Sequence, residues 1–194
     1  MEDMKLRIKG SEERTFTIHY SCSGFYNGGA LAPSICCITM TNLQTEEIHT
    51  FALHNYVLQG KNFVEAEREL LLDFVKFYNT LENPIVVHWL MDGSGYGFKA
   101  ITARCENFGI YDLSFIKMQA FDLSIYSNSS LRPTLERNHC TSVNILGGKE
   151  EALWFSQRNY NAVKLSTEAK SFGLTQLLKL YLKNDMETGS FIFD

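Results

Sequence analysis

The chain has 194 residues, of which 45% are hydrophobic, and it carries a formal net charge of −4. This length supports one hydrophobic core, so we expect a single domain over residues 1–194 with its core at about 15–182, and the net charge gives no overall attraction to nucleic acid or to anionic membranes. We expect a soluble, cytoplasmic protein with reduced thiols. The start of the sequence is not signal-like, no run approaches the roughly 20 apolar residues that span a bilayer, and the five cysteines include no CxxC pair.

Alternating residues predict three strands in the first third of the chain, at residues 15–21, 34–42 and 47–53. Short glycine-rich or polar connections between them indicate an antiparallel meander. The apolar period then changes from 2 to 3.6 over residues 62–81, which predicts an amphipathic helix. Asn62 is its expected N-cap.

Residues 83–109 predict a strand, a sharp corner and a helix in immediate succession. Ile85 to Val87 form an apolar, β-branched run, which is typical of a strand covered on both faces. A glycine-rich corner follows at residues 93–97. Apolar residues then recur at helical spacing from Phe98 onwards, and Gly109 is the expected end of that helix.

The second half of the chain predicts mostly helices. A short strand or turn is expected at residues 110–116, short helices at 119–126 and 133–140, and longer helices at 149–160 and 161–182. Gly173 lies inside the last of these and is interpreted as a bend. The whole pattern predicts an α/β protein of β-β-β-α-β-α order with a helical second half.

This order is that of the ribonuclease-H-like fold. The segments ERELLLDF, PIVVHW, YGFKAITAR and NYNAVKLSTEAKSFGLTQLL resemble, in type and sequence order, elements of the DEDD-class 3′-to-5′ exonucleases, which include the proofreading domains of DNA polymerases. The resemblance implies a ribonuclease-H-like mixed sheet. It also implies an ancestral centre in which four carboxylates hold two divalent metal ions.

None of the four metal carboxylates is present when the chain is aligned with that family. His19 and Ser21 stand at the two acidic positions of the first strand, and Gly97 stands at the acidic position of the second motif. Ser166 and Lys170 stand at the positions of the third motif. Lys170 would place a cation where a metal ion should lie, so the resemblance implies a degenerate site with no catalytic residue.

The leading functional hypothesis is therefore a non-catalytic exonuclease-like domain that serves as a nucleic-acid-binding or scaffolding subunit of a larger assembly, with no cofactor. One alternative is an active 3′-to-5′ nuclease that binds Mg²⁺ or Mn²⁺ through a rearranged set of carboxylates such as Asp92, Glu106, Asp112 and Asp122. Another is a small-ligand or nucleotide sensor that uses the corner at residues 93–97. The competing interpretation of that corner is a tight turn with no binding function.

Five further residues are candidates for binding single-stranded nucleic acid or an acidic protein segment: His88, Trp89, Tyr96, Arg104 and Lys164. His88 and Trp89 end the central strand, so we expect them beside His19 and Lys170 in one groove, where an aromatic ring stacks on a base. Lysines along the last helix, Lys164 among them, would follow a phosphate backbone. The competing interpretations are a packed tryptophan with a hydrogen-bonded histidine, and a solvated helix face.

Overall fold

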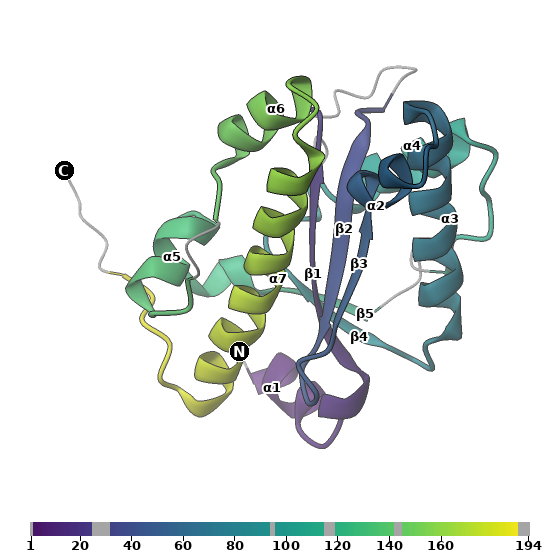
Figure 1. The fold of residues 1–194 in the computed structure, drawn as a ribbon. Coiled ribbons are helices and arrows are strands. Elements are labelled where there is room, and N and C mark those ends of the chain that lie inside the picture. Colours follow the sequence, from purple (N-terminus) through teal and green to yellow (C-terminus); the bar gives the residue numbers. More distant parts are fainter. Residues whose placement is uncertain (1, 25–31, 94–95, 115–118, 142–144, 190–194) are drawn as a thin grey trace.

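A mixed five-stranded sheet of order β3-β2-β1-β4-β5 forms the centre of the fold (Figure 1). The computed structural model describes residues 2–24, 32–93, 96–114, 119–141 and 145–189. β1 pairs antiparallel with β2 and parallel with β4, while β3 is antiparallel to β2 and β5 is parallel to β4. The predicted α/β class is confirmed, and the sheet order is consistent with a ribonuclease-H-like fold. The strands are β1 (Thr15–Cys22), β2 (Ile35–Asn42), β3 (Ile48–Ala52), β4 (Ile85–His88) and β5 (Gln119–Asp122).

The prediction of a helix over residues 119–126 was wrong. The chain forms β5 there and then the short 3₁₀ helix η3 (Leu123–Tyr126). β5 pairs in parallel with β4, and Ala120 lies opposite Val86 and Phe121 opposite Val87. Because β5 lies at the edge of the sheet and is only half-buried, it needs no β-branched run, and the pairing with β4 overrides its weak local preference.

Helices cover both faces of the sheet (Figure 1). α3 and α4 pack against one face, and Phe16, Ile18 and Tyr20 of β1 point into that core. On the opposite face, α7, α5 and α1 enclose a second core with Ile85 and Val87 of β4. The helices are α1 (Glu2–Ile8), η1 (Glu12–Arg14), α2 (Leu53–Leu58), α3 (Phe63–Thr80), α4 (Phe98–Asn107), α5 (Leu131–Arg137), α6 (Gly148–Ser156) and α7 (Tyr160–Lys183).

Several local signals act as predicted. Asn62 caps α3 in a capping box: its side chain accepts from the Glu65 amide, and the Glu65 carboxylate accepts from the Asn62 amide, both at 3.1 Å. Gly173 lies at a close contact, because a Cβ there would lie 2.7 Å from the carbonyl oxygen of Cys140. It allows α7 to approach the end of α5 closely.

A buried seam of hydroxyl groups joins α7 to β1 and β2. Three side-chain pairs form it, Thr17 with Thr175 at 2.6 Å, Ser21 with Thr167 at 2.7 Å, and Thr41 with Ser171 at 2.8 Å. The six residues are all buried. We call these six residues the hydroxyl seam. Each bond contributes about 1 kcal/mol net, and an unpaired partner would cost more than that.

None of the helices in the described part of the chain is long and apolar enough to cross a membrane. All five cysteines are free thiols, as predicted.

Candidate functional site

A pocket of about 550 Å³ opens at the carboxyl end of β1. β1 and the residues after it form one wall, and the starts of α5 and α6 form another. Lys170 of α7 and Tyr96, which precedes α4, complete the lining. Most of the lining surface is apolar, although about half of the lining residues carry polar or charged side chains. The lining residues are His19, Ser21, Cys22, Gly24, Tyr96, Ser130, Leu131, Arg132, Leu146, Gly147, Gly148, Lys149, Glu151, Ala152 and Lys170.

An ion pair between Lys170 and Glu151 lies in this lining. Lys170 Nζ is 2.7 Å from Glu151 Oε1, and both residues are only 6% exposed. Ser166 donates its hydroxyl to the same Glu151 oxygen at 2.7 Å and accepts from the Leu146 amide at 3.0 Å. Ser166 and Lys170 were expected at the degenerate site, whereas Glu151, which α6 brings to them across a turn, was not.

His19 presents an imidazole whose hydrogen-bonding capacity is unused within the described part of the chain. It is 6% exposed, and neither ring nitrogen has a hydrogen-bond partner among the residues that the structure describes. Burial, and secondarily the positive charge of Lys170, hold the pKa of His19 well below its ordinary value. The ring is therefore neutral at physiological pH, with one nitrogen able to donate and the other able to accept.

Ser21 and Cys22 contribute little reactivity to the pocket. The Ser21 hydroxyl is engaged by Thr167 in the hydroxyl seam. Cys22 donates its thiol to the Gly24 carbonyl at 3.0 Å, and burial raises the pKa of that thiol. A thiol kept protonated is a poor nucleophile, so neither residue is prepared for covalent chemistry.

The corner before α4 brings Tyr96 into the pocket lining. The Tyr96 hydroxyl donates to the carbonyl of Tyr20 at 2.8 Å, and the two rings are in contact with centroids 4.5 Å apart and planes tilted by 34°. Gly97 donates its amide to the Tyr20 hydroxyl at 2.7 Å. Its φ is +104°, and a Cβ there would lie 1.7 Å from the Met91 carbonyl oxygen, so only glycine fits. Ser94 and Gly95 lie outside the described residues.

His88 and Trp89 do not reach the pocket. His88 is fully buried, its Nδ1 accepts from the Met91 amide at 3.2 Å, and its Nε2 lies 3.2 Å from Asp92 Oδ2. Burial lowers the pKa of His88, against the opposing effect of Asp92 and Asp122. Trp89 is 3% exposed and packs in the core between the sheet and α7. The expected groove that joins Trp89 to His19 and Lys170 is therefore absent from the described structure. Burying the large indole ring in the core is more favourable than leaving it exposed at a groove.

Arg104 and Lys164 are engaged elsewhere. Arg104 forms a bidentate ion pair with the buried Glu67, with Nε at 2.7 Å from Oε1 and Nη2 at 2.5 Å from Oε2. Glu67 also accepts the Ile35 amide at 2.7 Å, so the pair ties α3 and α4 to the start of β2. Lys164 lies 3.0 Å from Glu168, which also accepts from the Thr50 hydroxyl of β3. Neither cation lines the pocket.

The carboxylates of the alternative metal site do not come together. Asp122 caps η3 through the Ser124 amide and accepts the Leu90 amide, and Asp112 accepts from the side chain of Asn79. Across the residues that the structure describes, no group of three or more His, Cys, Asp or Glu side chains is placed to hold a metal ion. The donor set around Lys170 does not fit two divalent ions either, because Glu151 is its one carboxylate.

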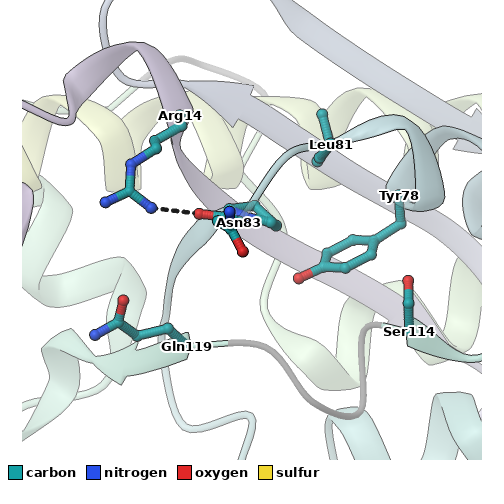
Figure 2. A pocket seen from close by; sticks show the side chains of 7 residues that line it. Arg14, Tyr78, Leu81, Asn83, Ser114 and Gln119 are labelled. Atoms are coloured by element: carbon teal, nitrogen blue, oxygen red, sulfur yellow. Dashed lines mark hydrogen bonds between the residues drawn. The ribbon is translucent and has the colours of Figure 1, made fainter.

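A second pocket of about 300 Å³ lies near the start of β4 (Figure 2). Arg14 in its lining donates to the Asn83 carbonyl at 2.5 Å and to Ser11 at 3.1 Å. Burial raises the pKa of Tyr78, whose ring faces this space. The lining residues are Arg14, Tyr78, Leu81, Asn83, Pro84, Ser114 and Gln119.

In comparisons with known proteins, no family model matches the chain and no curated protein matches its sequence.

Proposed function

We propose that this chain is a non-catalytic, exonuclease-like domain that acts by binding and not by cleaving phosphodiesters. The observation that supports this proposal is the contact of 2.7 Å between Lys170 and Glu151 in the pocket at the end of β1. Under the family alignment Lys170 stands at a metal-ligand position, and its ammonium would repel a metal ion there. Its charge is balanced by the protein's own carboxylate.

Two-metal hydrolysis needs several carboxylates to bind the ions and to position the attacking water. Glu151 is the single carboxylate among the described residues that line the pocket, and it already accepts from Lys170 and Ser166. His19 and Ser21, at the acidic positions of the first strand, are neutral ligands at best. The donor set thus favours a binding function for this pocket.

Of the two partner classes that the sequence suggests, a protein assembly fits the charges better than nucleic acid. Three of the cations along α7 that were expected to follow a phosphate backbone are balanced by nearby carboxylates, which reduces the charge available for releasing counterions. The pairs are Lys164 with Glu168, Lys170 with Glu151, and Lys179 with Glu46. We therefore propose a binding or scaffolding subunit, with single-stranded nucleic acid as the second candidate.

The second candidate depends on the rim of the pocket. Arg132 and Lys149 line it, and both are exposed, although Arg132 also lies 3.0 Å from Glu136 and 3.3 Å from Glu150. Two rim cations would support weak, strongly salt-dependent contact with phosphates. A gel shift at low salt that weakens in Lys149→Ala would favour this candidate.

The proposal is tested with end-labelled single-stranded DNA and RNA in millimolar Mg²⁺ or Mn²⁺. We expect no shortening of the strands, and no change in melting temperature on adding either metal, because no cluster of oxygen ligands is present to bind it. Degradation that disappears in Glu151→Gln would refute the proposal, since a contaminating nuclease would not depend on Glu151.

A further inference from the structure

The pocket at the end of β1 has the size and lining of a small-molecule site. Its volume of about 550 Å³ and its mostly apolar lining match the clefts that enclose small organic ligands. Leu131 of α5, Leu146 just before α6 and Ala152 of α6 contribute apolar wall. Such walls favour a ligand with an apolar body.

The two buried charges in the lining cancel, and the other charged residues of the lining, Arg132 and Lys149, are exposed at its rim. Lys170 and Glu151 contact each other at 2.7 Å and are both 94% buried, so neither has a charge to offer a ligand without first separating from the other. An anionic ligand group would face Glu151, and a cationic group would face Lys170. Either would lose its hydration without gaining a free counter-ion. This part of the pocket therefore discriminates against both signs of charge.

His19 supplies the hydrogen bond that such a ligand lacks elsewhere. Its ring is nine-tenths buried, lines the pocket, and has no partner for either nitrogen among the described residues. A buried polar group without a partner carries a cost that a bound ligand removes. The neutral ring has one donor and one acceptor, so it matches a hydroxyl or an amide, which can satisfy either.

We propose that this pocket binds a small, uncharged, mostly apolar molecule whose hydroxyl or amide group hydrogen-bonds to the imidazole of His19. This inference rests on the proposed non-catalytic function, because it needs Lys170 and Glu151 to remain paired. The family resemblance does not supply it, since a nuclease centre binds charged phosphates and metal ions.

The test compares probes that share one apolar ring and differ in the charge of the head group. Benzamide and benzyl alcohol are the uncharged probes, benzoate is the anion and benzylammonium is the cation. Each is titrated into the full chain, with the imidazole nitrogens of the five histidines followed by ¹⁵N NMR. We expect an uncharged probe to bind at least tenfold more tightly than either ion and to shift the ¹⁵N signals of His19 selectively.

Two variants localise the binding. His19→Phe keeps the volume of the ring and removes its hydrogen bonds, and it should weaken benzamide binding at least tenfold. Ala152→Leu leaves the His19 side chain unchanged but fills part of the pocket, and it should also abolish binding. His54→Phe is the matched control, because His54 lies on α2 and does not line the pocket.

Tighter binding of benzoate or benzylammonium would overturn the charge discrimination, and unchanged affinity in His19→Phe would overturn the hydrogen bond. If no probe shifts His19, the inference fails as a whole. These outcomes are separate from the strand-cleavage assay: the chain can lack nuclease activity and still reject these probes, in which case only the present inference falls.

Discussion

Breaking the ion pair between Lys170 and Glu151 should destabilise the protein, while replacing both residues should restore most of the loss. Each residue is 6% exposed and the charged atoms are 2.7 Å apart, so removing one partner leaves an uncompensated charge in a site with little water. A broken buried pair costs about 3 to 5 kcal/mol. For a chain of this size, a loss of about 3 kcal/mol lowers the melting temperature by roughly 6 to 12 °C.

The two single variants should differ. In Lys170→Met the remaining carboxylate keeps the hydroxyl of Ser166 as a donor, so its cost should lie near 3 kcal/mol, at the lower end of the range of about 3 to 5 kcal/mol. In Glu151→Leu the lysine keeps no carboxylate, and the cost should lie nearer 5 kcal/mol, at about the upper end. The double variant should return to within about 1 to 2 kcal/mol of the parent, the remainder being the lost hydrogen bond of Ser166.

Urea unfolding of the parent, both singles and the double variant measures these differences. Lys164→Met is the control on the same helix, because Lys164 and Glu168 are also 3.0 Å apart but their side chains are 20% and 23% exposed. That pair should contribute less than about 1 kcal/mol. A double variant as unstable as Glu151→Leu would refute the account, since the loss would then come from packing and not from an unpaired charge.

Three further predictions concern single positions. Since the pKa of His19 is depressed, the unfolded chain takes up a proton that the folded chain does not take up as pH falls below about 6.5. The contribution of His19 to the unfolding free energy should therefore be complete above that pH and decline below it. Urea unfolding of His19→Phe at several pH values should show a flatter decline. Gly97→Ala should lower the unfolding free energy by about 3 kcal/mol or more. The control Gly109→Ala should lower it by about 1 kcal/mol, because the new Cβ would meet nothing within 4 Å. A smaller loss at position 97 in urea unfolding would contradict the close approach to Met91. Arg104→Lys should lose the bidentate geometry and about 1 to 3 kcal/mol of unfolding free energy, while leaving binding at the pocket unchanged.

Strong periodicity made much of the fold predictable. The alternation in β1, the change of period at Asn62 and the β-branched run of β4 are local signals, and each agrees with the final packing. β5 was mistaken for a helix because the four residues from Gln119 to Asp122 carry no β-branched side chain and are held by pairing with β4. Such pairing is a long-range property that a sequence window does not contain.

The site was predictable only in part. The family resemblance selected His19, Ser21 and Lys170, and the structure brings these three to one pocket. Glu151 was missed because an acidic residue in the first turn of a helix usually serves the helix dipole, and nothing in the sequence indicates that it faces Lys170. Trp89 was misplaced because an aromatic residue at a strand end fits a groove and a core equally well until the neighbouring helices are known.

The hydroxyl seam restricts how α7 can move. An apolar helix face can slide along a sheet at modest cost, because one methyl group replaces another. Displacing α7 by one turn, about 5.4 Å, would instead separate three buried hydroxyl pairs at once. Lys170 lies between Thr167 and Ser171, two members of the hydroxyl seam. The hydrogen bonds of these two residues to β1 and β2 therefore fix the position of Lys170 along the sheet. A ligand entering the pocket would therefore meet a wall, formed by α7 at Lys170, that cannot shift along the helix axis to accommodate it. Selectivity by ligand size would follow from the hydroxyl seam that holds this helix in place.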